Sequence, residues 1–147
     1  MKKLLIVVSI LLFISIITGC NNKTKETIIK KESDKKVTSI KVLINNKSYD
    51  IELENNSTVD EFIKILPQEF NMEELNNNEK YVYMDKSLKT NPYNPKQIEK
   101  GDIMLYQDNC LVIFYKSFTT SYSYTKIGHI NNLNDLGKEN ITAIFEK

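Results

Sequence analysis

The residues that could support nucleophilic chemistry are few. Besides Cys20, the chain has one cysteine, Cys110, and its one histidine is His129. A cysteine is activated when a histidine lies within hydrogen-bond reach of its thiol, and a sequence gives no such distance. Cys110 begins the apolar run CLVIFY, where a free cysteine typically packs as a small hydrophobic side chain. We therefore favour structural roles for Cys110 and His129 and predict no catalytic residue.

Metal-binding and acid–base chemistry are equally poorly represented. One histidine and one free cysteine do not make a zinc site, which takes three or four ligands. Asp50, Glu52 and Glu54 fall at every second position, so they share the solvated face of a predicted strand. A hydrolase with paired carboxylates needs one of them in an apolar setting, and the sequence gives no sign of that. We expect no metal and no cofactor.

Aromatic and hydroxyl side chains are more informative. They crowd into the segment YKSFTTSYSYTKIGHI, residues 115–130, while two tyrosines share a face of another predicted strand. Tyrosine offers a large amphipathic contact area at small entropic cost, although strands are also rich in tyrosine and threonine for packing reasons. The candidate ligand-binding residues are Tyr81, Tyr83, Phe118, Ser121, Tyr122 and Tyr124.

The N-terminus has the layout of a secretion signal. Two lysines precede an apolar run at residues 4–17, which is too short to cross a bilayer comfortably. The following sequence Ile-Thr-Gly-Cys, residues 17–20, resembles the lipobox of bacterial lipoproteins, in which the cysteine carries fatty acyl chains such as palmitate. The resemblance implies a signal peptide at 1–19, lipidated Cys20 at the start of a flexible lysine-rich tether (20–36), and anchorage on the extracytoplasmic face of the cell membrane. A secreted protein with an incidental cysteine is the alternative.

The charges are unevenly distributed. All 20 basic residues are lysines, and the chain contains no arginine. Residues 37–147 hold 12 lysines and 16 acidic residues, a formal charge of −4. Proteins bind nucleic acid mainly through cations that meet phosphates, so this acidic domain argues against a nucleic-acid partner. If Cys20 is lipidated, Cys110 has no disulfide partner, and stability must come from a hydrophobic core.

Short strands are the elements expected to position these residues. Residues 37–44 and 49–53 are rich in β-branched and alternating apolar residues and predict a hairpin around the turn at 45–47. The continuous apolar run at 110–115 predicts a strand buried on both faces. Further strands are expected at residues 69–72, 80–84, 103–106, 126–130 and 140–145, with a turn at 76–78 and a loop at 87–100.

Two helices complete the expected set. The stretch Thr58–Leu66 has an apolar stripe at helical spacing, and Thr58 with Glu61 predicts a capping box at its start. Asn132–Leu136 predicts a single helical turn with Gly137 as its C-cap. Roughly eight short strands without strand–helix alternation indicate a mainly β domain at 37–147, an antiparallel barrel or sandwich.

Several short motifs in this domain resemble those of small bacterial cyclophilin-like domains. They are Gly101-Asp102-Ile103, Phe114-Tyr115-Lys116, the Ser/Thr/Tyr-rich stretch Thr119–Thr125, and Ile127-Gly128-His129-Ile130. The resemblance implies a closed eight-stranded β-barrel. It also implies that the tyrosine strand and the 118–124 segment form walls of the family's peptide groove.

The resemblance implies binding more than catalysis. Cyclophilins that isomerise X–Pro bonds use an arginine on the strand after the first helix, and this chain has none. The comparable stretch, Glu79–Met84, offers Lys80, which lacks the planar multi-donor fork of arginine. We therefore expect a lipid-anchored, non-catalytic module for a peptide or small ligand. The alternatives are a weak or specialised peptidyl-prolyl isomerase acting on exported proteins, and a structural or accessory module.

Overall fold

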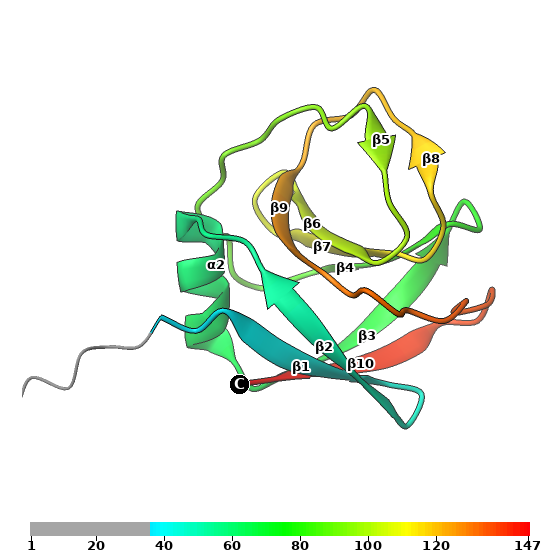
Figure 1. The fold of residues 1–147 in the computed structure, drawn as a ribbon, viewed down its shortest axis with the longest axis horizontal. Coiled ribbons are helices and arrows are strands. Elements are labelled where there is room, and N and C mark those ends of the chain that lie inside the picture. The colour runs from blue at the N-terminus through cyan, green and yellow to red at the C-terminus, as the bar shows by residue number, and fades with distance from the viewer. Residues whose placement is uncertain (1–35) are drawn as a thin grey trace, which may run out of the picture. The chain divides into compact units, whose positions relative to one another are not determined.

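Eight antiparallel strands close into a barrel in the computed structural model, which describes residues 36–147 (Figure 1). The strands follow one another around the barrel in the order β1-β10-β3-β4-β7-β6-β9-β2, while β5 and β8 pair with each other outside it. The prediction of a mainly β, closed eight-stranded barrel is therefore confirmed. The predicted signal peptide, Cys20 and the tether up to residue 35 lie outside the described residues.

The barrel strands are short and match the predicted positions to within a few residues. Their bounds are β1 Ser39–Ile44, β2 Lys47–Leu53, β3 Gln68–Leu75, β4 Glu79–Tyr83, β6 Asp102–Tyr106, β7 Cys110–Phe114, β9 Thr125–His129 and β10 Ile141–Glu146. The outer pair consists of β5 (Gln97–Ile98) and β8 (Phe118–Thr119).

Asparagine pairs turn two of the hairpins. Asn45 and Asn46 join β1 to β2 with φ angles of 48° and 64°, and Asn76 and Asn77 join β3 to β4 with 55° and 58°. Tight hairpin turns that match strand twist need positive φ at both central residues, and asparagine tolerates that region. The predicted turns at these positions are confirmed.

Alternation along each strand builds the interior of the barrel. In β1 every second residue is buried, and Val42, Ile51, Ile103 and Phe145 meet in one large core cluster. Residues 36–147 supply this large core, so that part of the chain has the apolar core it needs to fold on its own. No helix in this part of the chain is long and apolar enough to cross a membrane.

One helix covers an end of the barrel. It runs as α2 (Ser57–Phe62) and continues as the 3₁₀ turn η1 (Ile63–Ile65). Phe62 packs edge-to-face on Phe145 with ring centroids 5.5 Å apart, which joins the helix to the barrel core. The Asn56 side chain caps the helix by accepting a hydrogen bond from the Val59 amide at 2.9 Å.

The predicted capping box is wrong, since its two residues bind a different segment. The Thr58 hydroxyl donates to the Lys89 carbonyl at 2.6 Å, and the Glu61 carboxylate accepts from the Lys89 amide at 2.6 Å. This backbone contact lowers the pKa of Glu61, against the smaller effect of burial. Thr58 and Glu61 therefore tie the helix to the loop that follows β4.

The predicted helical turn at Asn132–Leu136 is also wrong, because the chain between β9 and β10 has no helix. The buried ammonium group of Lys80 donates to the carbonyls of Gly137 and Glu139, both at 2.7 Å, and lies 4.9 Å from the Tyr115 ring centroid. Lys80 thus satisfies carbonyl groups close to the position where a helix C-cap was expected.

Two loop segments form an arm over the outside of the barrel. The arm comprises residues 85–100 and 116–124, joined by the β5–β8 pair and by a bridge between Tyr93 and Tyr124. Between the arm and the barrel lies a second apolar cluster, which includes Ile98 of the arm together with Met104 and Phe114 of the barrel. All five residues of β7 are buried, so the prediction that this strand is covered on both faces is confirmed.

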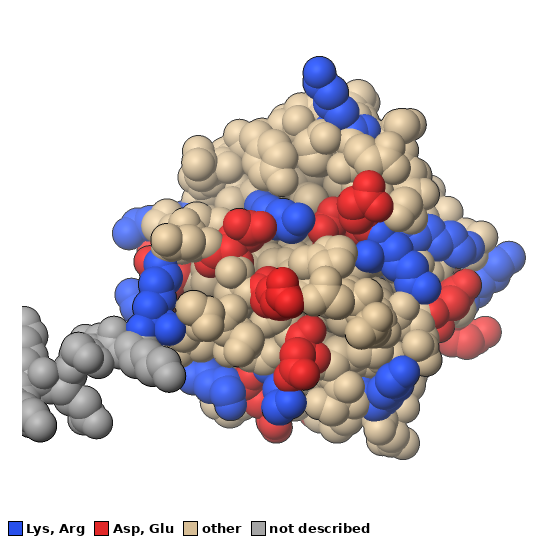
Figure 2. All heavy atoms as spheres, in the orientation of Figure 1, with Lys and Arg blue, Asp and Glu red and all other residues tan. Residues whose placement is uncertain are grey.

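Charges of both signs are interspersed on the face of the domain shown in Figure 2. Ion pairs such as Lys41–Asp50, at 2.7 Å, are exposed to solvent. Pairs of this kind contribute about 0–1 kcal/mol each, so the fold depends on its apolar core and not on surface charge.

Candidate functional site

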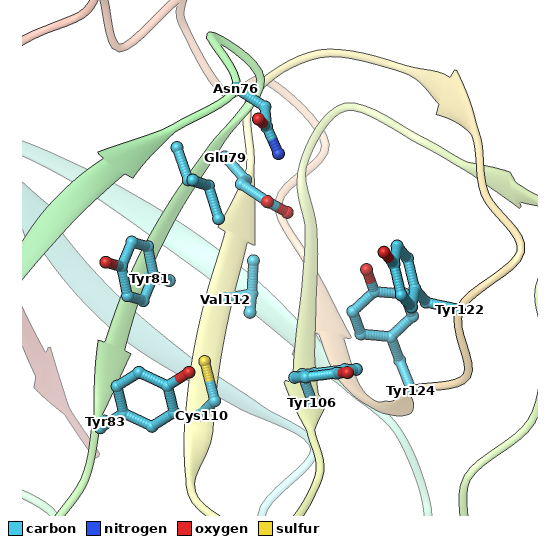
Figure 3. A pocket seen from close by; sticks show the side chains of 10 residues that line it. Asn76, Glu79, Tyr81, Tyr83, Tyr106, Cys110, Val112, Tyr122 and Tyr124 are labelled. Atoms are coloured by element: carbon cyan, nitrogen blue, oxygen red, sulfur yellow. The ribbon is translucent and has the colours of Figure 1, made fainter.

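The arm leaves part of the outer barrel face uncovered, and a cavity of about 290 Å³ lies there (Figure 3). We call this cavity the groove. It is lined by Leu75, Asn76, Glu79, Tyr81, Tyr83, Tyr106, Cys110, Val112, Tyr122 and Tyr124.

Cross-strand register creates the groove. On the outer face, Cys110 of the central strand β7 is flanked directly by Tyr83 of β4 and Tyr106 of β6. One row further, Val112 lies opposite Tyr81. Directly opposed residues in antiparallel strands have Cβ atoms about 4.5–5.5 Å apart, so a small residue between two tyrosines leaves a channel. Cys110 and Val112 form its floor.

Tyrosine pairs form both walls of the groove. Tyr81 and Tyr83 stack edge-to-face with centroids 5.9 Å apart on the β4 side. Across the floor, Tyr106 lies 6.0 Å from Tyr122 and 5.6 Å from Tyr124. Tyr83 and Tyr122 are 61% and 60% exposed, so each wall has one aromatic ring that is available for contact.

Glu79 lies at one end of the groove, and its carboxylate points into the space between the walls (Figure 3). Burial raises the pKa of Glu79, a hydrogen bond from Asn76 acts in the opposite direction, and the nearby charge of Glu74 adds to the increase. Within residues 36–147, Glu79 has no ion-pair partner. The groove therefore contains a partly desolvated carboxylate without a counter-ion.

The structure excludes a dyad of Cys110 and His129. Cys110 lies beside Tyr106 at one end of β6, whereas His129 pairs with Asp102 at the other end, about 13 Å along the strand. Burial, helped by the charge of Glu79 and opposed by a hydrogen bond from Tyr83, raises the pKa of Cys110 to about 11. The thiol is therefore protonated near neutral pH and acts as part of the floor.

His129 instead belongs to a charged cluster around Asp102, away from the groove. The buried Asp102 carboxylate lies 3.0 Å from His129 Nδ1 and 3.1 Å from Lys126 Nζ, and it accepts from the Glu99 amide at 2.9 Å. Burial works against the charged form of Lys126, but contact with Asp102 outweighs it and raises the pKa of Lys126. Asp102 thus links β6 to β9.

A smaller polar hollow of about 250 Å³ lies near this cluster. Its lining includes Tyr93, Thr125 and Lys126. Among the described residues, no three His, Cys, Asp or Glu side chains gather in a way that could hold a metal ion.

The Lys80 side chain does not line the groove. It is adjacent to Tyr81 on β4, and successive side chains on a strand point to opposite faces. Its ammonium group is held by the carbonyls of Gly137 and Glu139, and burial lowers the pKa of Lys80 against the attraction of nearby carboxylates. The one cation that the sequence offered for isomerase chemistry therefore lies on the face opposite the tyrosine walls.

Four of the six predicted ligand-binding residues meet in the groove: Tyr81, Tyr83, Tyr122 and Tyr124. The other two residues do not line the groove. Phe118 packs on Phe114 with ring centroids 5.5 Å apart, and the Ser121 carbonyl accepts a hydrogen bond from Asn94 at 2.8 Å.

Sequence reasoning missed the other six lining residues, which are Leu75, Asn76, Glu79, Tyr106 and the two floor residues. A signal for Tyr106 was present, because the predicted hairpin between 103–106 and 110–115 already places it opposite Cys110. A signal for Glu79 was also present, because Glu79 lies two residues before Tyr81 and so shares the strand face of Tyr81 and Tyr83, but the predicted strand began at residue 80.

The unpaired charge of Glu79 should reduce stability near neutral pH. Because burial raises the pKa of Glu79 in the folded protein, the folded state keeps this proton to higher pH than the unfolded chain. The free energy of unfolding therefore falls as pH rises from the ordinary carboxyl range through the folded pKa. We expect the stability of Glu79→Gln to increase relative to the wild type as pH rises from the ordinary carboxyl range through the folded pKa, measured by urea unfolding.

Glu69→Gln is the matched control, because Glu69 is an exposed carboxylate on β3 outside the groove. It should show no comparable gain. A Glu79→Gln variant that loses stability over the same pH interval would contradict this account of the groove.

Comparison with known proteins agrees with the geometry. The model of the Cyclophilin-like family matches residues 42–146, which span all of the barrel except the start of β1. Searches of curated proteins and of solved structures gave no significant match. The family match confirms the resemblance, and this chain belongs to the cyclophilin-like family.

Proposed function

We propose that this chain is a lipid-anchored, extracytoplasmic binding module that holds a peptide or small ligand in the groove without catalysing a reaction. The observation that carries the proposal is the groove itself: an open, tyrosine-walled cavity with a buried floor, in a domain of the cyclophilin-like family. Its volume of about 290 Å³ is close to the lower end of the range of about 300–1,000 Å³ for small-molecule sites.

The character of the groove supports recognition. Cys110 and Val112 are 4% and 3% exposed, so the floor is apolar and well packed. The exposed rings of Tyr83 and Tyr122 stand on opposite sides, and burying a tyrosine on binding removes a large area from water at low entropic cost. The groove therefore combines an ordered base with two rings that a ligand can cover.

The isomerase alternative has less support. Rotation about an X–Pro bond meets a barrier of about 18–20 kcal/mol, which a hydrogen-bonding cation near the proline nitrogen would lower. No lysine of the described part of the chain lines the groove, and Lys80 is committed to the other face of β4. If no ligand binds in the groove, the alternative of a purely structural or accessory module is favoured.

Ligand binding is tested by amide NMR spectra of residues 36–147, titrated with a defined panel of X–Pro tetrapeptides and small polar and aromatic fragments. We expect shift changes confined to residues 79–83, 106–112 and 122–124. Replacing Tyr83 and Tyr122 together by alanine should weaken binding of the panel's best ligand at least about tenfold, because central aromatic contacts often contribute more than 1 kcal/mol each.

Tyr93→Ala is the control, since Tyr93 is an exposed tyrosine of the arm that does not line the groove. It should leave affinity unchanged. The binding proposal fails if no panel member perturbs the groove amides, or if the folded double variant binds as the wild type does. Accelerated cis–trans exchange of the X–Pro peptides would instead support the isomerase alternative.

Membrane anchorage is tested on the full chain with Cys20→Ala in a bacterial host. Each acyl methylene buried in the bilayer contributes about 0.8 kcal/mol, so loss of the lipidated thiol should move the protein out of the membrane fraction or leave it unprocessed. Fractionation and labelled palmitate incorporation measure this. Cys110→Ala should behave as the wild type. Unchanged fractionation and gel mobility of Cys20→Ala would refute lipidation.

A further inference from the structure

We propose that the groove recognises an organic cation, an ammonium group carrying methyl substituents, held between the tyrosine rings beside the carboxylate of Glu79. This inference rests on the proposed binding function and specifies the chemistry of the ligand.

The first argument is charge. Among residues 36–147, Glu79 contributes the only ionisable carboxylate to the lining, and no lysine contributes to it. The carboxylate is partly desolvated and has no ion-pair partner among residues 36–147. A cation entering the groove would supply the missing counter-ion, whereas an anion would meet uncompensated repulsion.

The negative charge of Glu79 also affects two other ionisable groups of the groove lining. Burial raises the pKa of Cys110 and of Tyr124, and in both cases the negative charge of Glu79 adds to the effect. Negative charge is therefore disfavoured at the floor and at the arm-side wall. Burial disfavours a charge of either sign, so the part of these shifts that favours a cation is the one due to the charge of Glu79.

The second argument is the arrangement of the rings. Tyr83 lies on one side of the floor, and Tyr106 and Tyr122 lie on the other (Figure 3). Tyrosine rings have negative faces that attract cations, and several rings around one position are the usual means of binding quaternary ammonium groups.

The floor distinguishes between kinds of cation. A quaternary ammonium has no N–H group to satisfy, so the apolar surface of Cys110 and Val112 suits its methyl groups. A hard metal ion takes six or more oxygen ligands, and Glu79 is the only carboxylate in the lining. The cavity of about 290 Å³ also matches a small head group better than an extended ligand.

The test compares choline with 3,3-dimethyl-1-butanol, its uncharged carbon analogue, by NMR titration of residues 36–147 at constant ionic strength. We expect choline to shift the amides of 79–83 and 106–112 and to bind at least about fivefold more tightly than the analogue. Glu79→Gln should remove most of this preference, and Glu69→Gln should retain it. Tyr83→Leu, which keeps apolar bulk on an exposed residue, should weaken choline more than the analogue.

A second titration replaces choline by phosphocholine. Tighter binding of choline supports a free ammonium compound, and tighter binding of phosphocholine supports a lipid head group; both agree with ammonium recognition.

The results separate this inference from the proposed function. Equal binding of choline and its analogue in the groove, or an unchanged preference in folded Glu79→Gln, overturns ammonium recognition and leaves a neutral-ligand groove. Binding of other panel compounds without binding of choline does the same. If neither choline nor any panel compound perturbs the groove, both the inference and the proposed function fail.

Discussion

Strand β7 imposes the constraint on which the rest of the structure depends. Its residues Cys110–Phe114 are apolar at every position, so both faces must be kept from water. The inner face contributes to the barrel core, whereas the outer face needs a cover that the barrel cannot provide. The arm supplies this cover, and its β5–β8 pair and Tyr93–Tyr124 bridge hold it over the second apolar cluster.

The groove is the part of that outer face which the arm leaves open. Tyrosines on the neighbouring strands, together with Tyr122 and Tyr124 of the arm, shield the small floor residues from the sides without filling the space above them. Glu79 is partly desolvated by the same arrangement. A packing solution for one apolar strand thus produces a pocket with aromatic walls and one uncompensated charge, the properties on which the proposed recognition depends.

Sequence patterns predicted the barrel well because alternation and asparagine turns are local signals, as in β1, β2 and the turn at Asn45–Asn46. They located four groove tyrosines through strand parity and the family resemblance. The failures depend on long-range contacts. Thr58 and Glu61 bind Lys89 instead of capping their own helix, and Lys80 reaches carbonyls more than 50 residues away. Glu79 shares the strand face of Tyr81 and Tyr83, but the strand was predicted to begin one residue later.

The central claim is that the outer-face groove holds an organic cation between its tyrosine rings. It is tested most directly by intermolecular nuclear Overhauser effects between the N-methyl protons of choline and the aromatic protons of residues 36–147. The account predicts contacts with the rings of Tyr83, Tyr106 and Tyr122, which surround the floor. Contacts with Tyr93 in the smaller polar hollow, or no contact with any groove ring at saturating choline, would contradict it.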